Sequence, residues 1–323
     1  MNAASALKQL VNERIEALAF DQKQPKNLYE PMAYILRLGG KRLRPVLTML
    51  AYEAVSGRAP AEALDLGLGL EIFHNFTLIH DDIMDRAPVR RGQPTAHVKW
   101  NEDTAILAGD ALYAFAIGLV VKDFPEKAAA LSLAFSEVGL EVCEGQMEDM
   151  DLAAGIDVSM PRYVEMIRKK TAALLGGCMR MGAIAAGASD ELIADLKNFG
   201  ETLGIAFQLQ DDLMDAYPPE GFGKQVGGDI LENKQTWLIL QAKSKASPAQ
   251  LATIATWEAR DDAPQEKVAA ILAIFDELEI RAETERLIDE YFDKSRKLAD
   301  KLDASVEMLG LRNFIAHLAN RKL

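Results

Sequence analysis

Apolar residues recur at helical spacing, three or four positions apart, along almost the whole chain of 323 residues. No stretch of useful length alternates apolar and polar residues as a half-buried strand would. The apolar side chains are mostly Ala, Leu, Ile and Met, which favour helices, and aromatic side chains make up only 7% of the sequence. The pattern therefore predicts an all-α chain of about ten or more helices, because helices average ~10–14 residues.

The sequence contains no linker that would divide it. Pro and Gly separate the helical segments, and Ser247-Pro248 and Pro264 have the residue types that begin helices. We therefore predict a single domain over residues 1–323. The longest apolar run, "AILAGDALYAFAIGLVV", carries Asp110 near its middle, so we expect no membrane span.

The net charge of -13 argues against nonspecific nucleic-acid binding, which needs a basic surface. Local basic clusters in an acidic protein can still bind small anions. Both cysteines, Cys143 and Cys178, lie in apolar helical settings and are expected to be buried free thiols. The N-terminus has the pattern of an amphipathic helix rather than a signal peptide, and together these features predict a cytoplasmic protein.

Two similar acidic motifs stand out along the chain. In "LIHDDIMD" and "FQLQDDLMD" an apolar helical run ends in Asp-Asp-x-Met-Asp, and a proline and a basic loop follow. Asp81 and Asp85 lie one turn apart on one helix face, where like charges cost roughly 0.2–0.5 kcal/mol. A carboxylate at a helix C-terminus also meets the negative end of the helix dipole, at roughly another 0.3–1 kcal/mol. The motif around Asp211 and Asp215 carries the same penalties.

A bound cation removes these penalties. One such motif is as compatible with a solvated helix end as with a metal site, whereas two copies in matched contexts favour metal binding. Carboxylate oxygens suit Mg²⁺, which typically shares its coordination shell with substrate phosphates. The two motifs therefore predict phosphate chemistry supported by Mg²⁺.

Compact basic clusters near Pro or Gly provide candidate phosphate ligands. Arginine suits bidentate phosphate contacts and lysine acts as a point charge, although any one cluster is also compatible with a surface salt-bridge patch. The clusters are "GGKRLRP" (Lys41, Arg42, Arg44), "VRRG" (Arg90, Arg91), "RKKT" (Arg168, Lys169, Lys170, Thr171) and "FGKQVGGDILENKQT" (Lys224, Lys234).

With these clusters, the sequence resembles the trans-prenyltransferases, the polyprenyl diphosphate synthases that include the farnesyl and geranylgeranyl diphosphate synthases. The resemblance runs from about residue 30 to 240 and rests on several motifs in the family's order. These are GGKRLRP, the first DDxxD with its trailing RRG, "AILAGDAL", "EGQMEDMD", the Lys-Thr pair, and "FQLQDDLMD" followed by "FGKQVGGDILENK".

The resemblance implies the isoprenoid synthase fold, in which helices ring a central cavity and the two aspartate motifs face each other across its mouth. It also implies about three Mg²⁺ ions that bind an allylic diphosphate. Diphosphate leaves, isopentenyl diphosphate attacks the allylic cation, and a proton is lost. The allylic primer is dimethylallyl, geranyl or farnesyl diphosphate, and the protein is expected to be a homodimer.

The same resemblance assigns roles to individual residues. It implies that metal ligands are Asp81, Asp82, Asp85, Asp211 and Asp215. It implies that the allylic diphosphate is held by Lys170, Lys224 and Arg90, with Lys234 approaching the phosphates. It implies that isopentenyl diphosphate is held by Gly40, Lys41, Arg44, His74 and Arg91. Thr171 and Gln208 would line the reacting centre, and Gln146 and Asp149 match a pair of cavity-lining positions.

The length of the product depends on what stops the growing chain. Phe76 and Thr77 lie five and four residues before Asp81, where this family often places the cavity floor, and Tyr113 is a further candidate. Phe76 is also compatible with ordinary core packing. A phenylalanine beside a small threonine favours a C15–C20 product, and we lean to geranylgeranyl diphosphate; a farnesyl or longer polyprenyl product is the alternative.

Three other functions compete with this hypothesis. A metal-dependent phosphohydrolase would account for "IHDD" but not for two DDxMD motifs with four basic clusters. A terpene cyclase normally lacks the second full DDxxD and GGKRLRP. A catalytically silent partner subunit would not be expected to keep intact aspartates and lysines.

Overall fold

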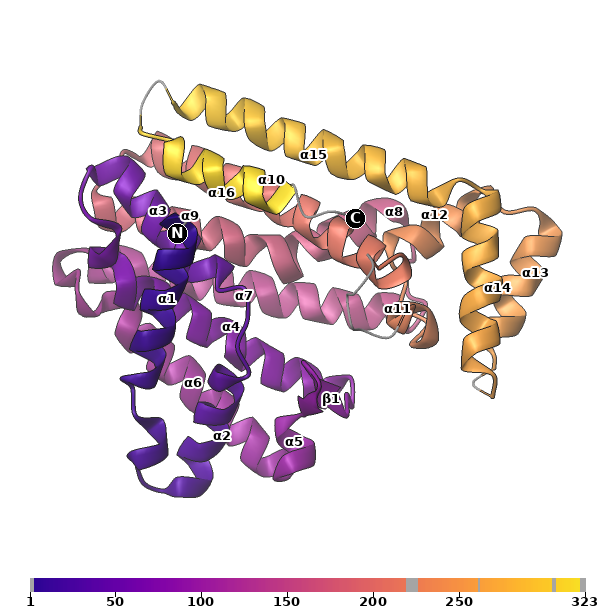
Figure 1. Ribbon diagram of the computed structural model, residues 1–323, viewed down its shortest axis with the longest axis horizontal. Helices are drawn as coiled ribbons and strands as arrows, with labels where there is room; N and C mark the ends of the chain where they lie inside the picture. The colour runs from indigo at the N-terminus through magenta and orange to yellow at the C-terminus, as the bar shows by residue number, and fades with distance from the viewer. Residues whose placement is uncertain (1–2, 219–225, 261, 304–305, 320–323) are drawn as a thin grey trace. The chain divides into compact units, whose positions relative to one another are not determined.

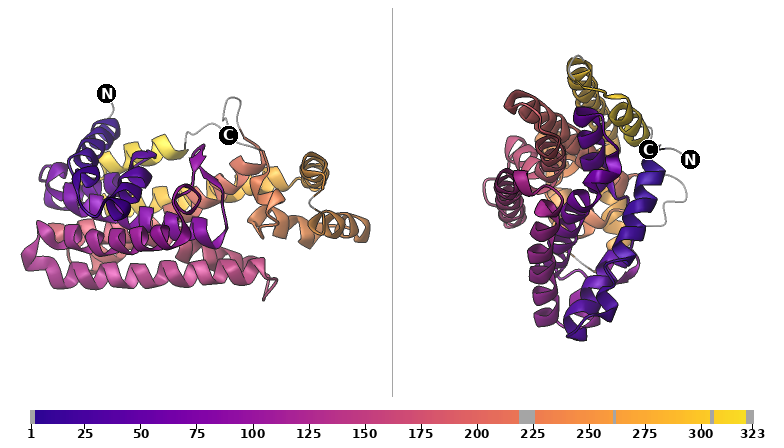
Figure 2. Two further views of the ribbon diagram at one scale, coloured as in Figure 1. Left: turned by 90° about the horizontal axis from the view of Figure 1, so that it is seen from below. Right: turned by 90° about the vertical axis from the view of Figure 1, so that its left-hand side faces the viewer.

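The computed structural model describes residues 3–218, 226–260, 262–303 and 306–319, and its ribbon is predominantly helical in every view (Figure 1, Figure 2). The α-helices are α1 (Ala3–Glu16), α2 (Lys26–Arg37), α3 (Leu43–Ser56), α4 (Leu64–Met84), α5 (Ala96–Lys99), α6 (Glu102–Lys122), α7 (Ala128–Ala153), α8 (Met160–Ile167), α9 (Ala173–Ala186), α10 (Asp190–Ala216), α11 (Gly228–Leu231), α12 (Trp237–Lys245), α13 (Pro248–Glu258), α14 (Pro264–Glu277), α15 (Ile280–Leu302) and α16 (Leu309–Ala319).

The remaining regular elements are short. Three 3₁₀ turns, η1 (Phe20–Gln22), η2 (Pro60–Ala63) and η3 (Pro125–Lys127), and one π-turn, η4 (Arg168–Ala172), interrupt or precede α-helices. Within the described ranges the strands are β1 (Val89–Arg90) and β2 (Gln93–Pro94), which pair antiparallel with Val89 opposite Pro94. The predicted all-α class is confirmed.

The chain forms two compact units. The first comprises Met1–Glu137, Gly177–Lys197 and Ser305–Leu311, and the second comprises Val138–Gly176, Asn198–Ala304 and Arg312–Leu323. The first aspartate motif and GGKRLRP belong to the first unit. The second aspartate motif and the Lys-Thr pair belong to the second unit.

Helices α4 and α6 pack along each other in the first unit (Figure 1). The N-terminal half of α4 is buried on every side because α3 also packs against it. Gly69 permits the close approach of α6, since a Cβ atom there would lie 2.8 Å from the Ala116 carbonyl oxygen. This packing fixes the axis of α4 and therefore the position of the aspartates in its last turn.

The GGKRLRP loop is fixed by a buried ion pair. Arg42 is 3% exposed and donates from Nη1 to Glu71 Oε1 of α4 at 2.8 Å. It also donates to the Leu36 carbonyl at 2.7 Å and to Asn12 Oδ1 at 3.0 Å. Arg42 therefore has a structural role, and its neighbours Lys41 and Arg44 remain the candidates for substrate binding.

Helix α6 is one helix of the described chain that is long and apolar enough to cross a membrane by length and composition alone. Core helices of soluble proteins meet the same criterion, and α6 packs on α2 and α4 within the first unit. Of the two cysteines, Cys178 is buried as predicted, but Cys143, on α7, is exposed. That part of the prediction was wrong.

The second unit contains the π-turn η4 between α8 and α9. Glycines on two neighbouring helices make room for it: a Cβ atom on Gly145 would lie 2.2 Å from the Lys170 nitrogen, and one on Gly204 would lie 2.5 Å from the Ala172 Cα. π-Turns often mark functional sites because they change the direction of side chains within a helix. Here the turn sets the directions of Lys170 and Thr171.

Candidate functional site

The first aspartate motif lies at the C-terminal end of α4, and an arginine from the adjacent hairpin forms an ion pair with it. Asp82 is 1% exposed, and Arg90 of β1 donates to its Oδ1 from Nε at 2.7 Å. Arg90 Nη2 lies 2.7 Å from the same oxygen and 3.6 Å from Asp81 Oδ2. Asp85 is the C-terminal cap of the helix. The predicted metal ligands Asp81 and Asp82 thus lie together with the predicted phosphate ligand Arg90.

The electrostatics of this cluster favour a further cation. Burial raises the pKa of Asp82 to about 6, and the positive charge of Arg90 opposes that rise. Among the described residues, none donates a hydrogen bond to the buried Oδ2 of Asp82. A carboxylate oxygen that is buried with unused acceptor capacity is a suitable ligand for a hard cation such as Mg²⁺.

A second feature of the first unit is a basic cluster around His74. Burial holds the pKa of His74 well below its ordinary value, and the charges of Arg44 and Arg91 lower it further. Burial also lowers the pKa of both Arg44 and Arg91. Arg90 and Arg42 add to the positive potential at His74. Such a concentration of desolvated positive charge favours binding of an anion.

The backbone of GGKRLRP shapes this cluster. Gly40 has a φ of +150°, and a Cβ atom there would lie 3.2 Å from Arg91 Nη2. Arg91, itself at a φ of +55°, donates from Nη1 to the Gly39 carbonyl. Lys41 is exposed beside them. The structure therefore brings together Gly40, Arg44, His74 and Arg91, four of the residues that the resemblance assigns to isopentenyl diphosphate.

An aromatic cluster lies between α4 and α6, below the aspartates. The ring centroids of Phe76 and Tyr113 are 5.3 Å apart, and those of Phe73 and Phe76 are 5.5 Å apart. Phe135 contacts both Phe73, at 5.2 Å, and Tyr113, at 5.6 Å. The sequence analysis missed Phe73 and Phe135, although Phe73 precedes Phe76 by nearly one helical turn. Thr77 donates to the His74 carbonyl at 2.8 Å.

His80 directly precedes Asp81 on α4. Its Nε2 lies 3.3 Å from the Ile106 carbonyl and 3.7 Å from Asp110 Oδ1, both on α6. Its ring also packs against Phe76, at 4.7 Å between centroids. A Cβ atom on Gly109 would lie 2.4 Å from the imidazole, so that glycine makes room for it. His80 thus connects α4 to α6.

In the second unit, a chain of hydrogen bonds orients Gln208 of α10. Its amide nitrogen donates to Asp212 Oδ1 at 2.8 Å, and its Oε1 accepts from Thr171 Oγ1 at 2.9 Å. Asp212 is buried and also accepts from the hydroxyl of Tyr163, on α8. Burial raises the pKa of Asp212. Tyr163 was missed by the sequence analysis because its partner lies on a different helix.

The lysines of η4 face carboxylates on α7. Lys170 Nζ lies 2.6 Å from Asp149 Oδ2, and Lys169 Nζ lies 2.7 Å from Glu148 Oε1. The sequence had matched Asp149 to a cavity-lining position, and it lies beside the predicted phosphate ligand. Lys170 therefore has a partner in the absence of substrate, and a diphosphate would have to compete for its ammonium group.

The segment after the second motif folds back onto Asp215. Asp229, in α11, donates its backbone N–H to Asp215 Oδ2 at 2.9 Å, and its own Oδ1 lies 3.4 Å from Lys234 Nζ. Burial and the charge of Asp215 raise the pKa of Asp229. The sequence analysis missed Asp229, although an acidic residue between the second aspartate motif and Lys234 could have indicated a further polar group of the site. Lys224 lies outside the described residues.

One pocket in the second unit is lined by most of the polar side chains described above for that unit. Its volume is about 100 Å³, and its polar lining comes from α7, α8, η4, α10 and the α11 segment. The residues that line it include Asp149, Lys170, Thr171, Gln208, Asp212, Asp229 and Lys234. Residues that were predicted from four separate parts of the sequence thus share one cavity. Lysines, carboxylates and neutral oxygens in one pocket suit a metal-bound diphosphate ester.

Within the described ranges, no three His, Cys, Asp or Glu side chains are close enough together to hold a metal ion. The donor chemistry nevertheless fits Mg²⁺, because the predicted ligands are all carboxylates and the buried Oδ2 of Asp82 has spare acceptor capacity. Mg²⁺ usually keeps several waters and completes its shell with substrate phosphates. The predicted ligands therefore suit a metal that arrives with its substrate.

Comparison with known proteins agrees with these features. The family model described as polyprenyl synthetase matches residues 25–275. The chain is similar to a geranylgeranyl diphosphate synthase of Methanosarcina mazei, with 44% identity over 69% of each chain. It is also similar to a geranylgeranyl pyrophosphate synthase of Geoglobus acetivorans, with 37% identity over 96% of this chain and 94% of the relative.

Solved structures give the same answer for the fold. A crystal structure of a geranylgeranyl pyrophosphate synthase superposes with a TM-score of 0.91, with 38% identity and full coverage of both chains. A geranylgeranyl pyrophosphate synthetase of Pyrococcus horikoshii superposes with a TM-score of 0.89 at 29% identity, over 99% and 98% of the two chains. The isoprenoid synthase fold expected from the resemblance is confirmed.

The basic cluster around His74 predicts anion binding that does not need a metal. Inorganic diphosphate should bind the purified protein in metal-free buffer, as measured by calorimetric titration. Replacing Arg91 with Met should weaken this binding roughly tenfold or more, because a charge-assisted contact is lost. The matched control is Arg86→Met, an exposed arginine of the same loop that is not among the arginines whose charges lower the pKa of His74. Equal affinities of the two variants would contradict the assignment of this cluster.

Proposed function

The chain belongs to the polyprenyl synthetase family and is a prenyltransferase, and from this premise we propose that it condenses isopentenyl diphosphate with an allylic diphosphate. The observation that carries the proposal is the pocket in which Lys170, Thr171 and Gln208 lie beside Asp212 and Asp229. In this pocket Lys170 can bind a diphosphate, and the neutral oxygens of Thr171 and Gln208 can stabilise an allylic cation. The proposed product is a C15–C20 prenyl diphosphate, with geranylgeranyl diphosphate favoured over farnesyl or longer products.

Ionisation of the allylic diphosphate is the demanding step. We propose that Asp81, Asp82 and Asp85 and, from the second motif, Asp211 and Asp215 hold Mg²⁺, which when bound neutralises charge on the leaving diphosphate. The lysines Lys170, Lys224 and Lys234, with Arg90, bind the diphosphate oxygens as the carbon–oxygen bond breaks with its electron pair. Arg90 would exchange its contact with Asp82 for one with diphosphate.

The allylic cation then needs stabilisation without a competing nucleophile. Gln208 and Thr171 offer neutral oxygens that can face the positive carbon. The amide of Gln208 is fixed because Asp212 accepts a hydrogen bond from its Nε2, which leaves Oε1 on the side of Thr171. The double bond of isopentenyl diphosphate attacks the cation, and the proton lost afterwards goes to the released diphosphate.

We propose that isopentenyl diphosphate binds the basic cluster formed by Gly40, Lys41, Arg44, His74 and Arg91. The lowered pKa of His74 supports this assignment, because it keeps the imidazole neutral and available as a hydrogen-bond donor beside the arginines. This diphosphate is not a leaving group. Its binding site therefore does not need metal-binding aspartates, and arginines that neutralise its charge are sufficient.

We also propose that residues 1–323 act as one polyprenyl synthetase domain in a cytoplasmic homodimer. Exposed apolar side chains on the first unit support self-association, because Leu107 of α6 and Leu133 of α7 are 61% and 59% exposed.

The proposed activity is tested with the purified chain alone. Radiolabelled isopentenyl diphosphate and each allylic primer, with Mg²⁺, should give labelled prenyl diphosphates that disappear when the metal is chelated. Release of phosphate without a longer prenyl chain would instead identify a phosphohydrolase. Cyclic products would identify a terpene cyclase. Activity only after addition of another subunit would identify a non-catalytic partner.

The aromatic cluster predicts how product length is set. Phe76→Ala should shift the product to longer chains, because the ring that closes the space between α4 and α6 is removed. Chromatography of the dephosphorylated products measures the shift. The matched control is Phe115→Ala, whose ring packs on Phe20 outside this cluster and should leave product length unchanged. Unchanged length in the Phe76 variant would refute the floor assignment.

A further inference from the structure

The helix α11 consists of one turn, Gly228–Leu231, between the second aspartate motif and Lys234. Helices this short are not stable on their own. None of its residues is buried, and its N-cap residue, Gly227, has no side chain that could cap the helix. Its position must therefore be set by contacts from neighbouring elements.

The N-terminal end of α11 is attached to Asp215. Gly227 donates its N–H to the Asp215 carbonyl at 2.8 Å, and Asp229 donates its N–H to Asp215 Oδ2 at 2.9 Å. Gly227 has a φ of +71°, and a Cβ atom on Gly228 would lie 3.1 Å from Asp215 Oδ1. The two glycines therefore let the backbone lie against the carboxylate. Any movement of α11 would change the environment of Asp215.

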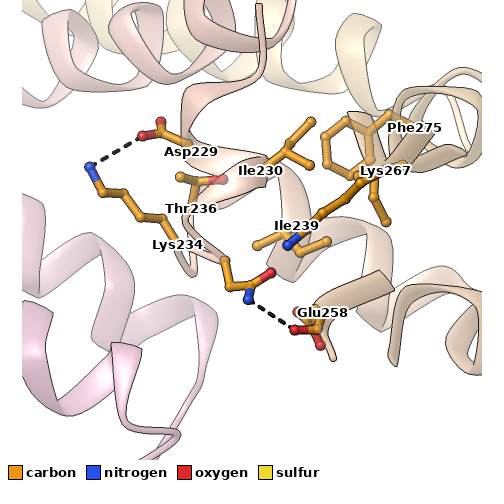
Figure 3. A pocket seen from close by; sticks show the side chains of 10 residues that line it. Asp229, Ile230, Lys234, Thr236, Ile239, Glu258, Lys267 and Phe275 are labelled. Carbon is orange, nitrogen blue, oxygen red and sulfur yellow. Dashed lines mark hydrogen bonds and ion pairs between the residues drawn. The ribbon is translucent and has the colours of Figure 1, made fainter. Parts of the chain in front are cut away.

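The C-terminal end of α11 is attached to α14. Lys267 of α14 is 2% exposed and donates from Nζ to the Leu231 carbonyl at 3.3 Å. Its side chain points into a small cavity of about 20 Å³ that Ile230 and Ile239 also line (Figure 3). The next residue, Val268, packs on Gly227, where a Cβ atom would lie 2.8 Å from Val268 Cγ1.

From these contacts we propose that Lys267 is a positioning residue for the diphosphate-binding segment. A buried ammonium group needs polar partners, and a carbonyl at a helix C-terminus is a favourable one. By holding Leu231, Lys267 fixes α11 and with it Asp229 and Lys234. The proposal deepens the proposed function and rests on it, because it gives this segment the task of binding the allylic diphosphate.

The test compares Lys267→Met with a matched control, Lys245→Met. Methionine keeps the apolar stem of Lys267 and removes the donor. Lys245 is also a lysine of the second unit with a fixed partner, but that partner is Glu283 of α15. Hydrogen–deuterium exchange over residues 226–234 reports how stably the backbone of α11 is held. Steady-state kinetics then reports the KM for the allylic diphosphate separately from that for isopentenyl diphosphate.

Lys267→Met should speed exchange over residues 226–234 and raise the KM for the allylic diphosphate roughly tenfold, the effect of losing one charge-assisted hydrogen bond. The KM for isopentenyl diphosphate should stay unchanged, and Lys267→Arg, which keeps a donor, should restore both readouts. A Lys267→Met variant that loses only thermal stability, with exchange and both KM values unchanged, would overturn the proposal. So would a Lys267→Arg variant that behaves like Lys267→Met.

These outcomes are distinct from failure of the proposed function. If the wild-type protein makes no prenyl diphosphate, the proposed function fails, and the exchange experiment still reports whether Lys267 holds α11. If the wild-type protein is active and exchange in α11 is the same in Lys267→Met as in Lys245→Met, only the positioning role fails.

Discussion

Buried carboxylate charge at the ends of helices is the constraint on which the rest of this structure depends. Asp82 is held out of solvent at the end of α4, and Asp212 is buried near the end of α10. Neither burial nor a helix C-terminus favours a negative charge. The neighbouring groups follow from this constraint: Arg90 lies on Asp82, whereas Tyr163 and Gln208 donate hydrogen bonds to Asp212.

The aspartates of one motif therefore have different roles. Asp212 uses both oxygens within the protein, and its hydrogen bonds fix Gln208, which in turn fixes Thr171. Asp215 accepts the backbone of α11 and connects the motif to Asp229. On the proposed metal assignment, a substitution in this motif should thus affect either metal binding or the geometry of the cavity wall, according to its position. Lys170 and Lys234, which line the same pocket, then provide positive charge that a diphosphate requires.

Local sequence predicted where several of the helices begin. Ser247 forms a capping box with Gln250 at the start of α13, and α14 begins at Pro264, because caps and proline act within one turn. The grouping of Lys170, Thr171 and Gln208 was predicted through family resemblance. The π-turn, the Tyr163–Asp212 contact and the burial of Lys267 were not predicted, because each depends on a partner helix distant in sequence, such as the α7 and α10 glycines beside η4.

The central claim, that the aspartates bind metal together with diphosphate, is tested most directly by counting bound metal. Mn²⁺ can replace Mg²⁺ in such sites and is measured by electron paramagnetic resonance. Adding inorganic diphosphate should raise the number of tightly bound Mn²⁺ ions to about three per chain, and Asp82→Asn and Asp211→Asn should each lower that number. Metal binding that is independent of diphosphate and unchanged in both variants would contradict the account.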